Sequence, residues 1–460
     1  MNTAKQTLSR IPALVFAAVL AAGCDTDFMI PDLNNPGLET LEQNPTRAAV
    51  IDATQGLMIG ARAGMAAQTG YVAHLGILGR ESITFDNSDP RYIDEMLAGA
   101  LDPGNGAFGG SGWAPRYANL RNASIVLNAL DQVSGFSAAE LEAIRGFAKT
   151  IQALDFLIVV NMRDVNGAVI DVNRPLDAEL APFVSKAEVF AHIVDLLDEA
   201  DAHLSSGGGS FPFQLTSGFT GFATPAAFRS FNRALRARVD VYMENYASAL
   251  TSLTASFFDP AGPLDLGVYH AFGTGSGDVA NGLFQGSDPQ IVAHPSARTA
   301  PDRKPDGSLD DRVAAKTAIL DPPQTDASGV ASDVRFTIYE DLASPVPIIR
   351  NEELTLLRAE ARWFTGDRAG AIADLNSIRQ RSGGLPPIAV PATDDAFITE
   401  LLEQRWLSLM LEGGHRWLDH RRFGRLDQLP RFSASETIPS AFPIPRNECV
   451  ARGLSTPCGF

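Results

Sequence analysis

Residues 351–381, NEELTLLRAEARWFTGDRAGAIADLNSIRQR, decide the fold of this chain. Their first half repeats apolar side chains every three or four residues, the period of a helix with one buried face, at Leu354, Leu357, Ala361 and Phe364. Gly366 and Asp367 provide a turn. The second half carries the facing apolar stripe at Ala371, Leu375 and Ile378. The stretch therefore predicts a helix-turn-helix unit of about 34 residues, the length of a tetratricopeptide repeat.

Further helical segments accompany this unit. Ser137 and Glu140 have the spacing of a capping box at the start of one of them. A helix pair cannot bury its apolar face alone and needs stacked neighbours. We therefore predict an all-α fold in which tetratricopeptide-like helix pairs stack as a scaffold, with long irregular, loop-rich insertions. The additional segments with the helical period are residues 46–63, 115–130, 137–160, 186–204, 225–246 and 394–413.

Two long stretches lack the helical period. Residues 81–112 and 257–347 are rich in Gly, Pro, Asp and Ser and carry scattered aromatic side chains. Loops of this length inside a compact domain are usually functional or disordered. Binding residues concentrate on loops that a rigid frame holds in place. We therefore expect the helices to form the frame and these insertions to recognise the ligand.

The N-terminus has the layout of an exported lipoprotein. Lys5 and Arg10 precede an apolar run at residues 11–22, and Cys24 follows after one glycine. The run is shorter than the ~20 apolar residues that cross a bilayer. We predict that residues 1–23 are a signal peptide and that Cys24 is lipidated. The alternative is an ordinary secretory signal followed by an incidental cysteine.

Export also bears on the other cysteines and on the partners. Cys449 and Cys458 are the only two left once Cys24 carries lipid, and a turn-forming run separates them. Because an exported chain meets an oxidising compartment, we predict that they form a disulfide, not a metal site. The formal charge of −17 and the lack of clustered Lys and Arg with interleaved aromatics argue against nucleic acid as a partner.

Several motifs occur in the order found in one protein family. They are ELTLLRAEA at 353–361, LNSIR at 375–379, QRW at 404–406, EGGHRWLDHRR at 412–422 and FPIPRNE at 442–448. Together with the lipoprotein signal, this order resembles the SusD/RagB-like family of outer-membrane lipoproteins, which deliver nutrients to a TonB-dependent transporter. Gln404 and Ser408 depart from the pattern, because the family typically carries Glu at the first position and often at the second. We expect these changes to weaken a charge network.

The resemblance implies a place and a role for the chain. It implies a protein that is lipid-anchored in the outer membrane, exposed at the cell surface, and without catalytic activity. Its ligand would be an oligosaccharide or a peptide, and its partner a TonB-dependent β-barrel transporter. The predicted organisation is a signal peptide at 1–23, a lipid-anchored tether at 24–44, and a single SusD-like helical-repeat domain at 45–460 with loop insertions at 81–112 and 257–347.

The densest group of ionisable residues lies within the 412–422 motif. At helical spacing, Glu412, Arg416 and Asp419 share one face, and general acid–base catalysis is one interpretation. We favour the other, in which these charges pair with one another and with Arg405 to fix the C-terminal helix. The two histidines of the motif are five residues apart, unlike the i, i+4 pair that binds zinc. We therefore predict no catalytic residue, no metal and no cofactor.

Loop aromatics are the candidates for ligand binding, because extracellular sugar or peptide sites combine aromatic faces with a few polar groups. The alternative for each aromatic is that it anchors its loop to the core. The insertions carry Phe85, Tyr92, Phe108, Tyr269, Phe272, Phe284, Phe336 and Tyr339. As the ligand-binding set we select Phe85, Asp86, Tyr92, Phe284 and Tyr339.

Three functions follow from these patterns, in order of preference. The first is a surface lipoprotein that binds an oligosaccharide or peptide nutrient and delivers it to a TonB-dependent transporter. The second is a periplasmic helical-repeat scaffold that binds only protein partners, and the third is a glycoside hydrolase with a helical frame. Ligand binding separates the first from the second, and turnover separates the third.

Overall fold

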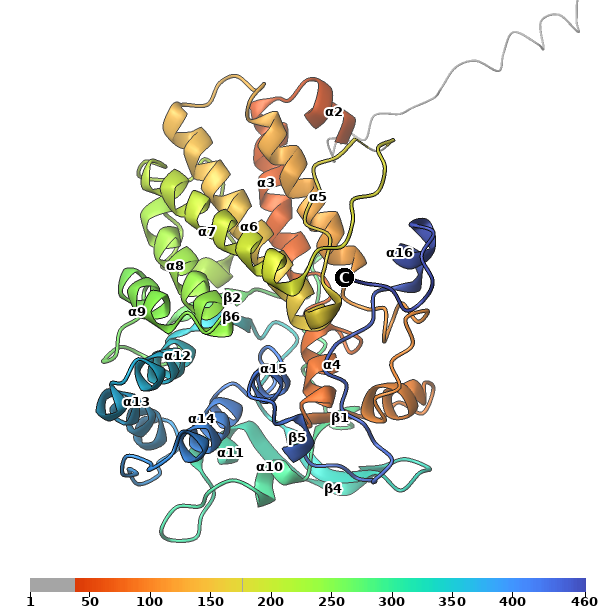
Figure 1. Ribbon diagram of the computed structural model, residues 1–460, viewed down its shortest axis with the longest axis vertical. Helices are drawn as coiled ribbons and strands as arrows, with labels where there is room; N and C mark the ends of the chain where they lie inside the picture. The colour runs from red at the N-terminus through yellow and green to blue at the C-terminus, as the bar shows by residue number, and fades with distance from the viewer. Residues whose placement is uncertain (1–37, 176) are drawn as a thin grey trace, which may run out of the picture.

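The computed structural model describes residues 38–175 and 177–460. The predicted signal peptide, the lipidation site Cys24 and most of the predicted tether lie outside these residues. Helices dominate the described chain, as the sequence predicts (Figure 1). None of the helices in these two ranges is long and apolar enough to cross a bilayer.

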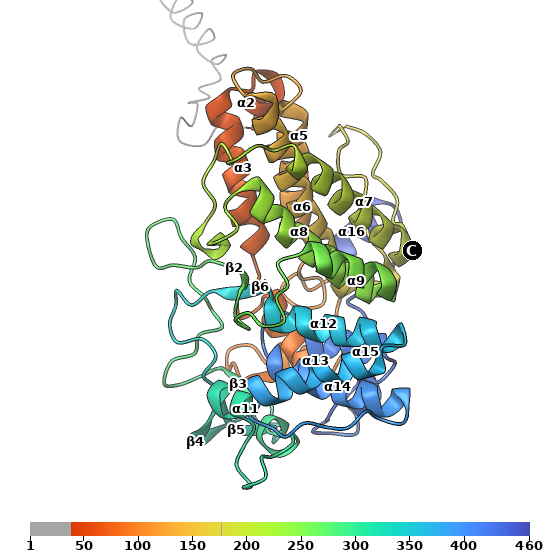
Figure 2. The ribbon, with the colours of Figure 1, turned by 90° about the vertical axis from the view of Figure 1, so that its left-hand side faces the viewer.

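A series of antiparallel helices forms the frame. It contains α3 (Arg47–Arg62), α5 (Ala114–Ala129), α6 (Ala138–Arg163), α7 (Lys186–Ser205), α8 (Pro225–Tyr242), α9 (Tyr246–Ala255), α12 (Asn351–Phe364) and α13 (Arg368–Arg381). Each helix of this series contacts the next, so the helix pairs stack as a repeat scaffold does (Figures 1 and 2). α14 (Asp394–Ser408) and α15 (His415–Arg422) then pack near α12 and α4 (Tyr71–Leu78).

Short helices complete the helical part. They are α2 (Leu38–Gln43), α10 (Ser296–Thr299), α11 (Asp311–Lys316) and α16 (Arg446–Ala451), the π-helix η1 (Tyr92–Leu97), and the 3-10 turns η2 (Asp164–Asn166), η3 (Ser217–Phe219) and η4 (Leu426–Gln428). The long α6 begins at the predicted capping box, where the Glu140 amide donates to Ser137 Oγ at 3.2 Å and the Ser137 amide donates to Glu140 Oε2 at 2.8 Å.

The helix pair α12 and α13 is present as predicted, but its contact face differs. Leu354, Leu357 and Ala361 are buried in the main core of the molecule and do not face α13. A second stripe of α12, with Leu356, Ala359 and Trp363, packs against Ala371, Leu375 and Ile378 of α13. α12 is therefore buried on two sides, because it lies between α13 and the earlier helices.

The two predicted loop insertions contain strands and meet in one sheet. β1 (Ser82–Thr84), β3 (Ile291–Ala293), β5 (Ala331–Phe336) and β4 (Thr317–Thr325) form a four-stranded sheet in this order, with Ile83 opposite Val292. β2 (Gly267–His270) pairs with β6 (Val346–Arg350) in a separate ribbon. In Figure 2, β3, β4 and β5 lie at the end of the molecule far from α2. The β2–β6 ribbon lies between that end and the end that carries α2.

The C-terminal tail lies on the surface beside α6 and the segment that follows it. Cys449 and Cys458 are disulfide-bonded, with Cα atoms 5.7 Å apart. The Phe460 amide donates to the Asn166 carbonyl at 3.0 Å, and Arg452 Nε donates to the Ala181 carbonyl at 3.1 Å. The tail is thus tied both to itself and to the residues after α6.

Candidate functional site

Most charges near α15 are buried and paired. Asp419 accepts hydrogen bonds from Arg405 Nε at 2.6 Å and from Arg422 Nη2 at 3.1 Å. Arg422 also donates to both oxygens of Glu360, at 3.0 and 2.9 Å. These bonds join α15 to α12 and α14, so the cluster fixes the C-terminal helix, as the favoured interpretation expects.

Glu412 and Arg416 do not share a face, and this part of the sequence interpretation is wrong. α14 ends at Ser408 and α15 begins only at His415, with Leu411 at a φ of 55° between them. Glu412 therefore turns away from the helix and accepts two bonds of 2.8 Å from Arg350. Arg416 donates to the Arg80 carbonyl at 2.8 Å and lies 3.5 Å from the centre of the Trp406 ring.

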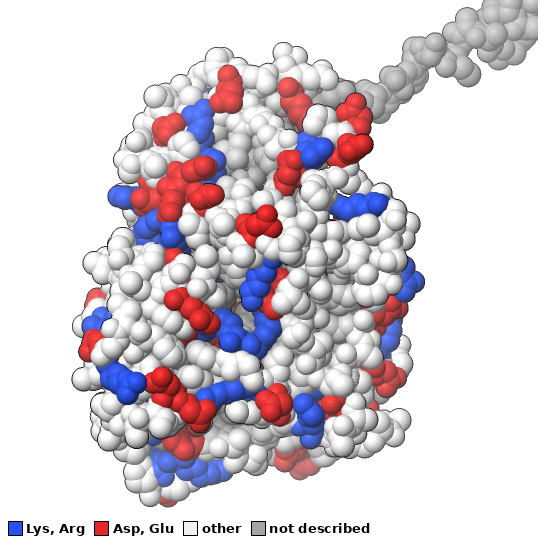
Figure 3. Space-filling view, viewed as in Figure 1, with Lys and Arg blue, Asp and Glu red and all other residues white. Residues whose placement is uncertain are grey.

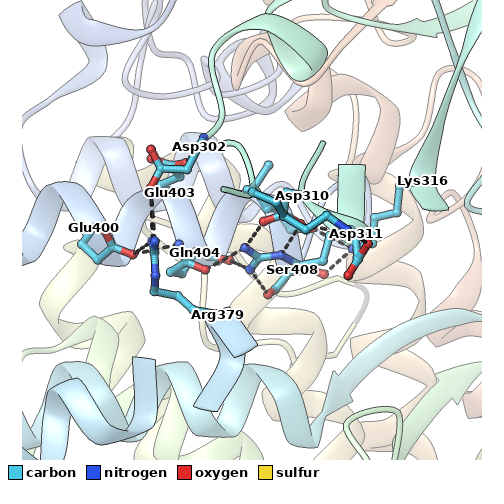
Figure 4. Close-up of polar contacts among 12 residues, drawn as sticks. Asp302, Asp310, Asp311, Lys316, Arg379, Glu400, Glu403, Gln404 and Ser408 are labelled. Carbon is cyan, nitrogen blue, oxygen red and sulfur yellow. Dashed lines mark hydrogen bonds and ion pairs between the residues drawn. The ribbon is translucent and has the colours of Figure 1, made fainter. Parts of the chain in front are cut away.

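The two departures from the family motif lie in a connected polar network (Figure 4). Arg312 is ion-paired with Asp310 at 2.6 Å and also donates to Gln404 Oε1 at 2.7 Å and to Ser408 Oγ at 3.0 Å. Gln404 donates in turn to Glu400 at 2.8 Å. The neutral side chain of Gln404 thus links Arg312 to Glu400 by hydrogen bonds. The polar network is present although positions 404 and 408 carry no carboxylate.

The structure buries three of the five predicted ligand-binding residues. Phe85, Tyr92 and Tyr339 belong to the main core. The Tyr92 ring meets the Phe108 ring edge-on, with centroids 4.9 Å apart, and the Tyr339 hydroxyl donates to the Leu411 carbonyl at 2.8 Å. All three side chains are thus held in contacts with the core. These three side chains therefore anchor their loops, which is the alternative that the sequence left open.

Asp86 and Phe284 are only partly buried, and the structure brings their loops together. Asp86 Oδ2 accepts from Gln68 Nε2 at 3.4 Å. The turn that carries Phe284 packs on the same segment, because a Cβ on Gly282 would lie only 2.8 Å from the Ala66 carbonyl oxygen. The two insertions thus meet at residues 66–68, and Asp86 and Phe284 are the members of the predicted set that stay accessible.

A separate cleft begins at the C-terminal part of α3, and we call it the Arg62 cleft. Its walls come from Met58, Ile59 and Arg62 of α3, from Thr216, Ser217 and Phe219 around η3, from residues 269–272 at the end of β2, and from residues 276–278. Its volume is about 370 Å³, within the ~300–1,000 Å³ of small-molecule sites. Tyr269 and Phe272, two of the loop aromatics in the sequence, belong to it.

Local backbone features position the walls of the Arg62 cleft. The pairing of β2 with β6 shifts register between Val268 and Tyr269, and such bulges re-aim the side chains that follow. The η3 turn approaches β2 so closely that a Cβ on Gly218 would lie 2.0 Å from the Tyr269 carbonyl oxygen. Only glycine fits this contact, which sets Ser217 at the rim of the cleft.

Arg62 and Asp278 face each other across the cleft. Their side chains form an ion pair, and they are 12% and 36% exposed. Arg62 Nη1 donates to the Ala271 carbonyl at 2.5 Å, and its guanidinium carbon lies 5.9 Å from the centre of the Phe272 ring. The Val279 amide donates to Asp278 Oδ1 at 2.8 Å, and this bond together with Arg62 lowers the pKa of Asp278. Asp278 is therefore ionised at neutral pH.

His270 lies at the base of the cleft. It is 5% exposed, and it also lines a smaller cavity of about 40 Å³, together with Tyr242 and His415. Burial, with the nearby cations Arg116 and Arg62, lowers the pKa of His270 to about 3. The ring is therefore neutral at physiological pH and can accept or donate a hydrogen bond.

Nothing in the sequence around Arg62 marks it as a binding residue. It ends an amphipathic helix, where a cation is expected because it interacts favourably with the helix C-terminus.

A second groove of about 370 Å³ lies between α5, α6, α7 and residues 170–173. At its edge Asn128 and Asn173 exchange hydrogen bonds of 2.8 and 3.1 Å, but none of its lining residues forms an ion pair across it.

The chain is similar to SusD-like proteins in one segment of its sequence and in its fold. Residues 337–443 match the model of the SusD family. A SusD-like carbohydrate-binding protein from Bacteroides fragilis NCTC 9343 superimposes with a TM-score of 0.69 at 15% identity, covering 90% of this chain and 99% of that one. A laminarin-binding SusD-like protein gives 0.63 at 17% identity, with 90% and 98% covered. NanU from B. fragilis gives 0.67 at 14% identity, with 91% and 98% covered.

No curated protein sequence matches the chain. At these identities, the structural matches establish the fold. The family match covers the segment from the end of β5 to the residues before α16, where the motifs of the sequence lie. Residues 337–443 therefore carry the match to the SusD family, and the described chain has the fold of SusD-like proteins.

Proposed function

We propose that this protein is a surface-exposed lipoprotein that binds a saccharide nutrient in the Arg62 cleft and delivers it to a TonB-dependent outer-membrane transporter. The observation that carries the proposal is the cleft itself, which places an aromatic and apolar wall beside one ion pair and several hydroxyl groups. Saccharide sites combine these features, because sugar rings stack on apolar surfaces and their hydroxyls need donors and acceptors. The laminarin-binding and carbohydrate-binding relatives support a saccharide over a peptide.

The same cleft argues for binding without turnover. Glycoside hydrolysis generally uses two carboxyl groups that flank the scissile bond. Asp278 is the only carboxylate among the residues that line the Arg62 cleft, and it is bonded to Arg62. The carboxylates of the α15 cluster are buried in ion pairs and cannot reach a ligand. We therefore infer a non-enzymatic role.

The proposed anchor and partner rest on the N-terminal sequence and on the family. A lipid on Cys24 would hold the protein at the outer membrane, and the chain from residue 25 to α2 would serve as the tether. A binding protein that releases its cargo to a transporter also needs a contact with that transporter. Affinity purification of the tagged, lipidated protein from its native membrane, followed by mass spectrometry, tests whether a TonB-dependent β-barrel accompanies it.

Calorimetric titration against a panel of oligosaccharides and peptides tests the site. Arg62→Met keeps the aliphatic stem but removes the guanidinium, and we expect it to weaken binding of the best ligand about tenfold or more, the loss typical of a charged hydrogen bond. The matched control is Arg229→Met, which removes an arginine that is also paired with an aspartate, Asp201, at 2.7 Å on the outer surface of α8. This variant should bind as the wild type does.

Three other outcomes have distinct meanings. Unchanged affinity in Arg62→Met together with loss in Asn128→Ala would move the site to the second groove. Unchanged affinity in both variants, with loss in Phe284→Ala, would return it to the junction of the two insertions. Binding of no saccharide or peptide in the panel would favour the protein-binding scaffold instead.

A further inference from the structure

The ion pair in the Arg62 cleft bears on which saccharides fit, if the cleft is the binding site proposed above. Among the residues that line it, only Arg62 and Asp278 carry a formal charge, since His270 is neutral. The two opposite charges are in direct contact. The cleft therefore has no unpaired cation to offer an anionic ligand.

The hydrogen-bonding state of Asp278 strengthens this point. Its Oδ1 atom takes part in both recorded contacts of the side chain, with Arg62 and with the Val279 amide. Its Oδ2 atom accepts no hydrogen bond from any described residue. An ionised carboxylate can only accept, so the free Oδ2 atom is complementary to an O–H donor. A sugar hydroxyl has such a donor, whereas the carboxylate of an acidic sugar has none.

We propose that Asp278 makes the Arg62 cleft selective for uncharged saccharides over saccharides that bear a carboxylate. An acidic sugar would have to displace Asp278 from Arg62 or bind beside the intact ion pair with no unpaired cation to offset its own charge. A neutral sugar can leave the ion pair intact and donate to Asp278 Oδ2. The net charge of −17 acts in the same direction at longer range, and Figure 3 shows acidic side chains spread over the face that it draws.

The loop around Asp278 is built to hold this carboxylate in place. The Asp278 amide donates to the Gly275 carbonyl at 3.0 Å, and the Gly273 amide donates to the Val279 carbonyl at 3.0 Å. The turn thus closes on itself and sets the side chain toward Arg62. Asp278→Asn keeps the size of the side chain and the carbonyl oxygen that can accept from Val279, but removes the charge and adds N–H donors.

Asp278→Asn therefore tests selectivity without changing the shape of the cleft. Glycan-array binding followed by calorimetry would compare neutral oligosaccharides with counterparts of the same linkage that carry a uronic acid. We expect wild-type protein to prefer the neutral member, and Asp278→Asn to shift the affinity ratio toward the acidic member by about tenfold or more, because Arg62 becomes available for charge-assisted hydrogen bonds. Asp306→Asn, which removes an exposed carboxylate outside the cleft, should leave the ratio unchanged.

The outcomes separate the two proposals. If the best wild-type ligands carry carboxylates and Arg62→Met abolishes their binding, the selectivity inference fails and the binding function stands. If the ratio in the correctly folded Asp278→Asn variant equals that of wild type, Asp278 does not set selectivity. If no glycan binds the wild type, or Arg62→Met binds all of them normally, both proposals fail.

Discussion

Glu81 is a carboxylate in an unfavourable place. Its side chain is buried next to β1, Oε2 accepts only a long bond of 3.3 Å from the Leu411 amide, and no described residue bonds to Oε1. Burial raises the pKa of Glu81 to about 8, although the positive charge of Arg416 opposes the shift. The folded protein therefore keeps this proton up to about pH 8, whereas the unfolded chain releases it near pH 4.5.

This difference gives a pH-dependent term in stability. A pKa that is higher in the folded state stabilises the fold at acidic pH, and the stabilisation is lost as the pH rises from about 4.5 to about 8. The difference in free energy of unfolding between Glu81→Gln and wild type should therefore depend on pH. Between pH 5 and pH 8 we expect this difference to shift by roughly 2–4 kcal/mol in favour of Glu81→Gln, because only the wild type loses the stabilisation. Urea unfolding at a series of pH values measures this. If the free energies of unfolding of wild type and Glu81→Gln change with pH in parallel, the expectation is contradicted. Glu179→Gln, at an exposed position, serves as the control.

Arg350 and Glu412 form a buried pair that the sequence did not indicate. A buried charge left with no partner costs about 3–5 kcal/mol. Arg350 keeps a second carboxylate partner, Glu352, so we expect Glu412→Gln to lower the free energy of unfolding by less, about 1.5–3 kcal/mol, the contribution of a hydrogen bond to a charged group. Arg229→Met breaks an exposed pair and should cost at most about 1 kcal/mol. Denaturant titration compares the two, and an equally small loss in both would show that the Arg350–Glu412 bond contributes little.

At the scale of single residues, composition and spacing identified the right classes of side chain but not their positions. Phe85 and Tyr92 lie in a Gly- and Asp-rich stretch that predicts exposure, yet both rings are buried because β1 and η1 draw the stretch into the core. Tyr269 and Phe272 have the same sequence context and line the Arg62 cleft. Tertiary contacts decide whether such a ring packs in the core or lines the cleft, and these contacts leave no local pattern in the sequence.

Secondary-structure elements divide into those with an amphipathic period and those without it. α6 and α12 were predicted because capping signals and apolar stripes mark them. α4 is buried on every side, so its sequence has no polar face and no period. β1 and β3 are three residues long and also fully buried, too short and too uniform to show the alternation of a strand.

Two predicted helices are also interrupted in ways that local pattern hides. The segment 225–246 is divided between α8 and α9, with Glu244 at a φ of 60° in the break. The segment 394–413 ends early, at Ser408, before Leu411 at a φ of 55°. Neither position is a glycine, and positive φ values are uncommon for other residues. Neither position therefore carries a residue type that would predict the end of a helix.

The C-terminal element gives a prediction of its own. Cys449 in α16 and Cys458 in the tail are nine residues apart, so their disulfide closes a small loop. Closing a loop of this size stabilises a fold by about 2–3 kcal/mol in the chain-entropy description. We expect Cys449→Ser with Cys458→Ser to lower the free energy of unfolding by that amount. Alkylation in urea without reductant, followed by intact-mass measurement, should find no free thiol at these positions, and two added labels would refute the bond.

At the scale of the whole molecule, the helical frame and the likeness to SusD-like proteins could be predicted because helix periodicity and ordered motifs are distributed along the chain. The Arg62 cleft could not, because it exists only where α3, η3, β2 and the following loop meet. Of its residues, the sequence supplied Tyr269 and Phe272 as members of a long candidate set. Arg62 and Asp278 gain their significance only from each other's position.

The anchor is a property of the whole molecule and is testable without the structure. Cys24→Ala removes the only thiol that could carry the predicted lipid, so the variant should lack an acyl label and leave the membrane fraction. Metabolic labelling with a radioactive fatty acid and fractionation of the cells measure both effects. Membrane association that persists in Cys24→Ala at the wild-type level would exclude lipid as the anchor.

The walls of the Arg62 cleft come from three widely separated parts of the chain, residues 58–62, 216–219 and 269–278. In biosynthesis, the α3 wall emerges long before the loop that carries Asp278, so a nascent or truncated chain has no cleft. In evolution, the same arrangement lets each wall change independently. An insertion after β2 can alter the rim without disturbing α3, because loops tolerate length changes that helices in a stacked frame do not. One helical frame can thus accommodate a new ligand through changes in one wall of the cleft at a time.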